Sequence, residues 1–435
     1  MLNHSLIPVR GARRRPAIAA VAIAILGVAL TGATPTYGPG FQTTGTVARV
    51  KPSKRPAIEA AFPRDSYRPR SAARLVIFSK HVREVRMQIF RAGTETGRIG
   101  PRDEMRGTAV TPVRRLGHLR RNQTVWVQIP DEPTGLYYVK LIAGPRVGYA
   151  PFVLRPDRLG RNRIAVVLPT FTWQAYNFHD DDEDGEGDTW YAAPSRKMTA
   201  RLGRPYENRG VPPHYKYYDQ PFLQWLYQEK RAVDYLGQTD VARSTGHRLA
   251  GAYDLIIFPG HHEYVTKREY DAVEGFRNRG GNLMFLSANN FFWKVVTRGS
   301  VMYRVHMWRD IGRPEAALIG VQYIGNDMGE HRSPWIVRNV DAAPWLFADT
   351  DLHNASSLSS AGIEIDKTQP SSPRGTKVLA ELPNLLGPGR TGQMTYYEKG
   401  AAKVFAAGAF TLAGSVRQPT VSRIMDNLWE RLSRP

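Results

Sequence analysis

Cysteine is absent from the 435 residues of the chain. Its absence excludes disulfide bridges, thiolate metal sites, cysteine nucleophiles and a lipid anchor on an N-terminal cysteine. Charged residues make up only 23% of the sequence and apolar residues 42%, which excludes a fully disordered chain and a polytopic membrane protein. A globular chain of this length is expected to form at least two domains.

Acidic residues are scarce in the first part of the chain. Residues 1–163 contain 29 Lys/Arg and only 9 Asp/Glu, a net charge of +20, whereas the whole chain carries +21. We interpret this excess either as a solvated basic face or as a surface that is attracted to an anionic envelope polymer or lipid. Zinc-finger spacing, RNP-like aromatic motifs and basic leucine-zipper patterns are all missing, which argues against nucleic acid as a partner.

The amino terminus has the pattern of an export signal. Arg13, Arg14 and Arg15 precede the apolar stretch 17–30, and small residues follow at Thr31 and Ala33. We predict a signal peptide or, alternatively, an uncleaved membrane anchor over residues 1–33. Either reading places the protein outside the cytoplasm, secreted or anchored by its N-terminus. Residues 34–63 are rich in Pro, Gly, Thr and Lys and are expected to form a linker.

Residues 64–156 show strand patterns without a helical stretch. Residues 85–90 and 124–129 alternate between apolar and polar side chains with period two. Further strand signals lie at residues 73–78, 135–141 and 149–154. Several short strands at regular spacing predict a small all-β sandwich domain.

Residues 163–435 change to continuous apolar runs separated by helical patterns. Strands buried on both faces are expected at 164–168, 253–258, 282–287 and 404–409. The best-defined helix begins after Thr266, which forms a capping-box pair with Glu269, and ends at Gly280-Gly281. Strands that alternate with helices predict a doubly wound α/β domain, in which ligands bind beyond the carboxyl ends of the strands.

Polar side chains follow these expected strands. The first strand leads to Tyr176, the second to His261 and Glu263, and the third to Asn289, while Glu398 precedes the last strand. A carboxylate beside an imidazole suits either a metal site or general acid–base catalysis. Without thiolates, oxygen ligands favour a hard cation such as ferric iron. Alternatively, His261 and Glu263 cap the helix that follows them.

An acidic loop at residues 179–188 carries the densest charge in the chain. Asp180, Asp182, Asp184 and Asp188 match the start of a D-x-D-x-D-G calcium loop, but position twelve is Tyr191 and not a glutamate. The sequence leaves three interpretations open for this loop. It binds calcium, it is simply solvated, or it forms salt bridges to the basic sandwich.

Three ordered motifs carry a family resemblance. They are Leu-Pro-Thr-Phe-Thr-Trp-Gln-Ala-Tyr-Asn at 168–177, Phe-Pro-Gly-His-His-Glu-Tyr at 258–264, and Gly-Gly-Asn-Leu-Met-Phe-Leu-Ser-Ala-Asn-Asn-Phe-Phe-Trp at 280–293. Residues 160–435 resemble the large (beta) subunit of N,N-dimethylformamidase and its relatives. The resemblance implies a class I glutamine-amidotransferase-like, flavodoxin-like domain over 163–435, without a nucleophilic cysteine.

The resemblance also implies a mononuclear ferric site. Glu263 and Tyr176 would be ligands, and the second tyrosine would be Tyr191, with Tyr206 as the alternative. His261, Asn289 and Glu398 would then be the catalytic groups around the metal. The implied activity is metal-dependent hydrolysis of the carbon–nitrogen bond of a small amide. The alternative is a non-catalytic, envelope-associated protein whose basic sandwich docks on anionic polymers. A small partner subunit or an oligomer is compatible with either function.

Overall fold

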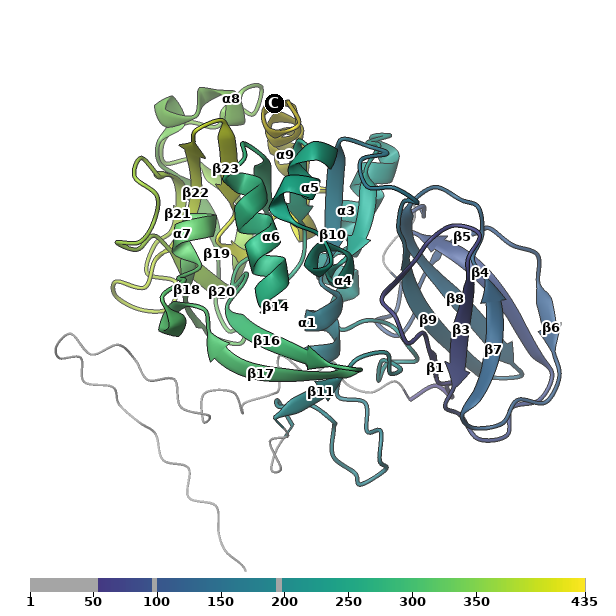
Figure 1. Ribbon diagram of the computed structural model, residues 1–435. Coiled ribbons are helices and arrows are strands. Elements are labelled where there is room, and N and C mark those ends of the chain that lie inside the picture. The colour runs from purple at the N-terminus through teal and green to yellow at the C-terminus, as the bar shows by residue number, and fades with distance from the viewer. Residues whose placement is uncertain (1–53, 96–99, 193–197, 435) are drawn as a thin grey trace, which may run out of the picture. The chain divides into compact units, whose positions relative to one another are not determined.

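The computed structural model of the protein describes residues 54–95, 100–192 and 198–434 (Figure 1). The expected signal or anchor at 1–33 and most of the linker at 34–63 lie outside these ranges. None of the helices within them is long and apolar enough to span a bilayer.

The first part of the described chain consists of two sheets around one core. The three-stranded sheet has the order β1 (Ala60–Ala61), β3 (Ala72–Ile77), β7 (Gln123–Gln128). The six-stranded sheet has the order β2 (Ser66–Tyr67), β9 (Arg146–Leu154), β8 (Gly135–Ala143), β4 (Val85–Ala92), β5 (Gly107–Ala109), with β6 (Arg114–Leu116) also paired to β4. Alternate residues such as Leu75, Ile89 and Val125 point into the core between them.

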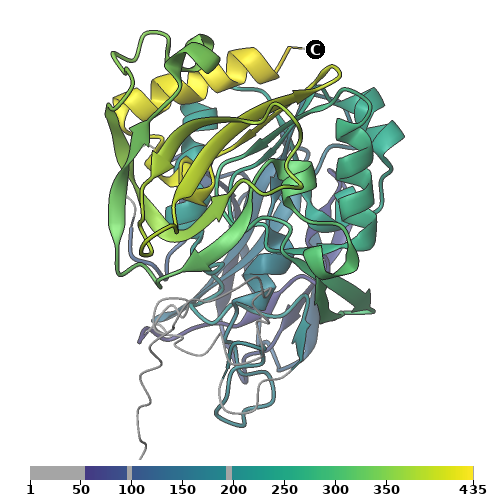
Figure 2. The same cartoon turned by 90° about the vertical axis from the view of Figure 1, so that its left-hand side faces the viewer.

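The largest sheet has eleven strands and is parallel in only one part. The parallel neighbours are β12 (Asp234–Gly237), β10 (Ile164–Leu168), β13 (Leu255–Phe258), β15 (Asn282–Phe285) and β23 (Ala402–Ala406). The antiparallel strands are β22 (Gly392–Lys399), β21 (Lys377–Leu382), β19 (Arg332–Val337), β20 (Ser357–Lys367), β18 (Gln322–Asn326) and β24 (Ala409–Phe410). Figure 2 shows the light-green and yellow strands of this antiparallel part nearest the viewer.

The predicted doubly wound, glutamine-amidotransferase-like α/β fold is therefore wrong. The described chain is mostly β, and its strands lie in four sheets. A separate four-stranded sheet has the order β11 (Thr199–Arg201), β17 (Val301–Met307), β16 (Trp293–Arg298), β14 (Tyr264–Thr266). The prediction failed because it rested on four fully buried strands, whereas residues 293–399 form further strands of mixed exposure that give weaker signals.

Two apolar clusters cover opposite faces of β10. Val166 and Leu168 pack in one cluster with residues of α3 (Gln220–Gln228) and α9 (Pro419–Leu432). Ala165 and Val167 pack in the other with α5 (Gly246–Ala252) and α6 (Lys267–Arg277). Period-two alternation of a strand buried on both faces accounts for this division. Shorter helices are α1 (Thr170–Ala175), α2 (Tyr215–Tyr218), α4 (Gln238–Ala242), α7 (Ala316–Ile319) and α8 (Pro344–Phe347).

The six-stranded sheet packs directly against the second part of the chain. Leu136, Tyr138 and Tyr149 belong to the same apolar cluster as Leu223 of α3. Polar contacts also cross this boundary, since the Tyr235 N–H donates to the Thr134 hydroxyl at 2.8 Å. The two parts therefore share buried surface.

Candidate active site

Two segments that follow neighbouring strands meet at one edge of the large sheet. β10 leads into α1, which ends at Tyr176, and β13 leads into the loop that carries Glu263. The Thr172 hydroxyl of α1 accepts the N–H groups of Glu263 and Tyr264 at 3.1 and 3.4 Å. These bonds fix the loop against the helix, at the carboxyl ends of two parallel strands.

Tyrosine hydroxyls gather around the carboxylate of Glu263. The Tyr176 hydroxyl donates to Glu263 Oε2 at 2.7 Å, and the Tyr191 hydroxyl lies 3.2 Å from the same oxygen. The hydroxyl of Tyr264 contacts that of Tyr191 and accepts the Trp190 indole N–H at 3.1 Å. The rings of Tyr176 and Tyr191 stack with their centroids 4.4 Å apart. The result is a compact set of phenol and carboxylate oxygens.

Burial dominates the electrostatics of this set. It raises the pKa of Glu263 to about 7, although hydrogen bonds from Tyr176 and the charge of Arg304 act in the opposite direction. Burial and the nearby Glu263 charge also raise the pKa values of Tyr176 and Tyr191 well above 10. Without a bound cation, burial therefore disfavours negative charge on the side chains of Tyr176, Tyr191 and Glu263.

The donor set fits a hard cation. Tyr176, Tyr191 and Glu263 offer only oxygen ligands, and each phenol oxygen lies within 3.3 Å of the carboxylate. Oxygen ligands of this kind suit hard metal ions better than soft ones. A cation among them would offset the cost of burying their negative charge.

A histidine and a second carboxyl adjoin the tyrosine–glutamate set. His261 Nε2 lies 3.6 Å from Glu263 Oε2 and 3.5 Å from Glu364 Oε2, which β20 delivers from a distant part of the sequence. Among the described residues, neither His261 Nε2 nor Glu364 Oε2 has a hydrogen-bond partner. Burial lowers the pKa of His261 well below 6.5, so its ring is neutral. Burial and the charge of Glu263 raise the pKa of Glu364 well above 4.5.

Asn289 contacts Glu364 and a further buried carboxyl on β20. Its side chain hydrogen-bonds to Glu364, and its backbone N–H donates to Asp366 Oδ1 at 2.9 Å. The backbone of Asn289 has a positive φ of 51°, a conformation that asparagine tolerates better than most residues. Burial raises the pKa of Asp366 to about 7. The loop after β15 thus binds two buried carboxyls of β20.

The family described as "N,N-dimethylformamidase beta subunit-like, C-terminal" matches residues 109–423. The chain belongs to this family. The match spans most of the chain and confirms the resemblance inferred from the three sequence motifs. A comparison with curated proteins gives no match.

Three solved structures show distant likenesses to this member of the dimethylformamidase-like family. The sporulation control protein Spo0M from Bacillus subtilis is 11% identical, with a TM-score of 0.16 over 23% of this chain and 50% of its own length. A superoxide reductase (neelaredoxin) from Ignicoccus hospitalis is 13% identical, with a TM-score of 0.14 over 24% of this chain and 80% of its own. A Paenibacillus cycloisomaltooligosaccharide glucanotransferase is 11% identical, with a TM-score of 0.15 over 58% of this chain and 34% of its own.

The structure brings together most of the site residues expected for the family. Tyr176, Tyr191, Glu263, His261 and Asn289 lie around one centre. The alternative ligand, Tyr206, instead packs edge-on against Trp173 with ring centroids 6.5 Å apart.

Glu398 has other partners. It lies on β22, its side chain is 49% exposed, and it pairs with Arg431 at 2.8 Å. It also accepts a hydrogen bond from the Tyr396 hydroxyl. Among the described residues, no contact joins Glu398 to the tyrosine–glutamate set.

Sequence reasoning missed three members of the centre. Glu364 and Asp366 lie on β20, a strand that was not predicted and that follows none of the three family motifs. No local sequence pattern identifies Glu364 and Asp366, because their position at the centre depends on the pairing of β20 with strands that are distant in the sequence. Tyr264, in contrast, directly follows Glu263 within the second motif, and this position in the sequence could have identified it as a member of the centre.

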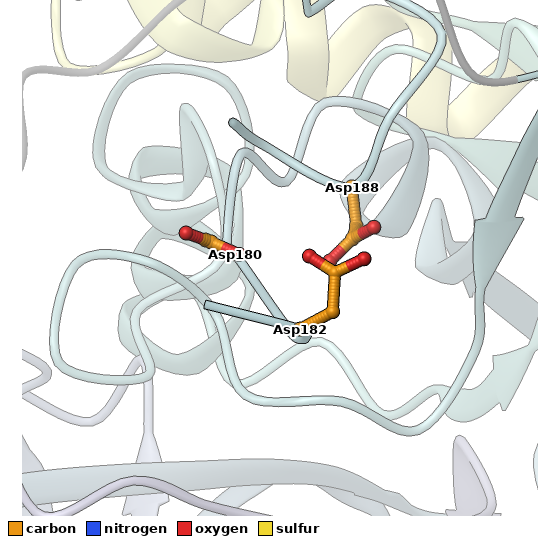
Figure 3. Close-up of side chains that lie close together, drawn as sticks. All are labelled: Asp180, Asp182 and Asp188. Atoms are coloured by element: carbon orange, nitrogen blue, oxygen red, sulfur yellow. The ribbon is translucent and has the colours of Figure 1, made fainter. Parts of the chain in front are cut away.

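The acidic loop lies between Tyr176 and Tyr191 in the chain. Carboxylate oxygens of Asp180, Asp182 and Asp188 come within 4.8 Å of one another (Figure 3). Asp184 lies outside this trio and accepts the N–H of Glu186 at 2.8 Å. Calcium binding by these aspartates stays a prediction.

Salt bridges tie the same loop to the basic sandwich. Glu183 pairs with Lys80 at 3.1 Å and with Arg121 at 2.8 Å. His179 lies 3.5 Å from Glu59 Oε1 and 2.8 Å from Asp181 Oδ1. The interpretation of the loop as a salt-bridge partner of the sandwich is therefore confirmed for Glu183, whose two partners lie in the sandwich.

Proposed function

We propose that the protein hydrolyses the carbon–nitrogen bond of a small amide at the centre formed by Tyr176, Tyr191 and Glu263. The observation that carries the proposal is the buried carboxylate of Glu263, which receives two phenol hydroxyls within 3.3 Å. Membership of the dimethylformamidase-like family supports the same reaction class. Water would add to the amide carbonyl, and the bond to nitrogen would break to give a carboxylic acid and an amine.

We assign Tyr176, Tyr191 and Glu263 as the ligands of a mononuclear ferric ion. Their oxygen donors suit this hard cation, and Tyr264 supports the set through its contact with the Tyr191 hydroxyl. Ferric iron held by these three residues would supply Lewis-acid polarisation of the amide carbonyl.

Glu364 is the group best placed to move the proton. Burial and the nearby Glu263 charge raise its pKa well above 4.5 and so favour the protonated carboxyl, from which Oε2 can donate to the leaving nitrogen. The neutral His261, 3.5 Å away, can accept or return a proton at Nε2. The Asn289 side chain orients Glu364 through its hydrogen bond.

Metal analysis of the full chain tests this proposal. We expect about one iron per chain together with a visible absorption band from tyrosine coordination, and amine release from small amides. Tyr176→Phe and Glu263→Gln should lose both the metal and the activity. Tyr206→Phe is the matched control, because it removes a hydroxyl from a buried tyrosine outside the centre. A folded wild-type protein that binds no iron and releases no amine contradicts the proposal.

We also propose that the protein works outside the cytoplasm. The support is the sequence of residues 1–33, and N-terminal sequencing of protein from membrane and secreted fractions would separate cleavage from anchoring. The alternative function, docking of the basic sandwich on an anionic envelope polymer without catalysis, draws on the +20 net charge of residues 1–163. It predicts polymer binding that survives Glu263→Gln.

A further inference from the structure

A cavity that is separate from the tyrosine–glutamate centre lies where the sandwich meets the second part of the chain. Its volume is about 540 Å³, enough for a drug-sized organic molecule. The β1–β2 connection, α1, α4, the start of α6 and the β16–β17 hairpin all contribute to its walls. None of Tyr176, Glu263 and His261 lines it.

The cavity has an apolar wall and a basic mouth. Phe62, Phe152, Phe171 and Trp173 line it and are otherwise almost completely buried. Four exposed cations line it as well, namely Arg64, Arg243, Lys267 and Arg268. Aromatic walls with a few charged groups are typical of sites for small organic ligands.

Positive charge at the mouth exceeds the negative charge available to neutralise it. Lys267 pairs with Asp271 at 2.6 Å, but Arg64, Arg243 and Arg268 make no salt bridge to any carboxylate of the described chain. Asp65 is the acidic residue among those that line the cavity. Its Oδ2 atom already accepts the Thr170 hydroxyl at 2.9 Å and the Thr239 N–H at 3.1 Å.

We propose that this cavity binds an organic anion with an apolar, aromatic-sized body. The body would pack against the aromatic wall, and the carboxylate would meet the unpaired guanidinium groups at the mouth, where arginine suits carboxylate geometry. Neither the aromatic wall nor the arginines alone would select an organic anion with an apolar body. The aromatic wall accepts neutral molecules equally well, while the arginines alone attract any small anion.

The cavity and the metal centre share helix α1. Phe171 and Trp173 face the cavity, whereas Thr172 accepts the N–H groups that position Glu263 and Tyr264. The binding site does not depend on the proposed hydrolysis, since its residues are not those of the tyrosine–glutamate set. Binding can therefore be measured whether or not the chain is an amidase.

Calorimetric titration of the full chain with 2-naphthoate tests the proposal. We expect saturable binding of one equivalent, with weaker binding of the uncharged 2-naphthylmethanol and of acetate, which lacks the apolar body. The double variant Arg243→Gln/Arg268→Gln should weaken naphthoate binding roughly tenfold or more. The matched control Arg279→Gln/Arg423→Gln removes the same charge from exposed positions outside the cavity and should bind like the wild type.

A third variant, Ala242→Trp, is designed to fill the cavity with a large side chain. Ala242 lines the cavity from α4, so Ala242→Trp should abolish binding. Tyr176→Phe should leave naphthoate binding intact, which separates this site from the metal centre. Absence of saturable binding, equal binding of 2-naphthylmethanol, or an unchanged affinity in the double arginine variant would each overturn the proposal. If Ala242→Trp does not fold, the double variant still decides the outcome.

Discussion

His261 Nε2 and Glu364 Oε2 face each other across 3.5 Å in the buried centre of the protein. The two side chains come from elements that are far apart in the sequence, the loop after β13 and the strand β20. Burial opposes charge on both side chains, because it lowers the pKa of His261 and raises that of Glu364. The pair is therefore suited to exchange protons with a molecule that contacts both atoms from one side.

Glu364→Gln should separate proton transfer from metal binding. Glutamine keeps the shape of the side chain but cannot donate the carboxyl proton, so we expect amide hydrolysis to fall about 10²- to 10⁴-fold. Iron content and thermal stability should stay near wild-type values, because Glu364 is not among the proposed ligands. Loss of iron in this variant would instead place Glu364 in the ligand set. Glu398→Gln, on the exposed side chain that pairs with Arg431, is the matched control and should leave hydrolysis unchanged.

Tyr264→Phe should weaken metal binding without abolishing it. The Tyr264 hydroxyl contacts the proposed ligand Tyr191 and accepts the Trp190 N–H, so it supports the site without being one of its proposed ligands. Loss of a supporting partner of this kind reduces metal affinity about 10- to 100-fold. Competition with a chelator measures this effect. An affinity equal to that of Tyr191→Phe would show that both tyrosines are ligands.

The stability of the protein should decrease between about pH 6.5 and 9 through His179. Burial disfavours the charged ring, but hydrogen bonds with Asp181 and Glu59 outweigh burial and raise the pKa of His179 from 6.5 to about 9. The stabilisation is complete below pH 6.5 and is lost as the pH rises through 9, with a total on the order of 3 kcal/mol. Chemical unfolding at several pH values measures it, and His179→Gln should remove this part of the slope.

Arg204→Met should destabilise the protein and disturb the centre. The Arg204 guanidinium is fully buried and donates to the carbonyls of His179, Gln174 and Asn177 at 2.8, 3.1 and 2.7 Å. Methionine fills part of the volume but removes all three hydrogen bonds. The carbonyls of Gln174 and His179 still accept the N–H groups of Asn177 and Asp188, so the main cost of about 1–3 kcal/mol comes from the unsatisfied carbonyl of Asn177. We expect a lower melting temperature and reduced iron content, because Tyr176 lies within this bonded segment. Arg201→Met, a nearby and more exposed arginine, should have a smaller effect on both.

Local patterns predicted several elements well and the fold class badly. The apolar run 164–168 coincides with β10, and Thr266 caps α6 by accepting the Glu269 N–H. Those signals are contained within a few residues. Strand β18 pairs with β20, and β19 pairs with β21, so these strands depend on partners that do not follow them directly in the chain. Their mixed exposure leaves little periodicity for sequence reasoning to detect.

The residues of the candidate site also fall into those that local sequence patterns predict and those that they do not. Tyr176 and Glu263 were identified because each follows a buried strand within a family motif, and Tyr191 followed from its place after the acidic loop. Glu398 was predicted as a catalytic group and Glu364 was not, because the sequence does not show which antiparallel strand reaches the centre. That choice depends on sheet register, which distant pairings determine.

The ion pairs of Glu183 with Lys80 and Arg121 join the acidic loop to the sandwich. The loop that they hold joins the two tyrosines of the centre, and His179 adds a further contact to Glu59 of the sandwich side. A truncated chain that begins after the sandwich would lose these contacts, together with the apolar surface of Leu136 and Tyr138. We therefore expect the C-terminal part to keep the geometry of the centre poorly when it is expressed alone, and exchange of sandwiches between relatives would have to preserve the residues that meet this loop.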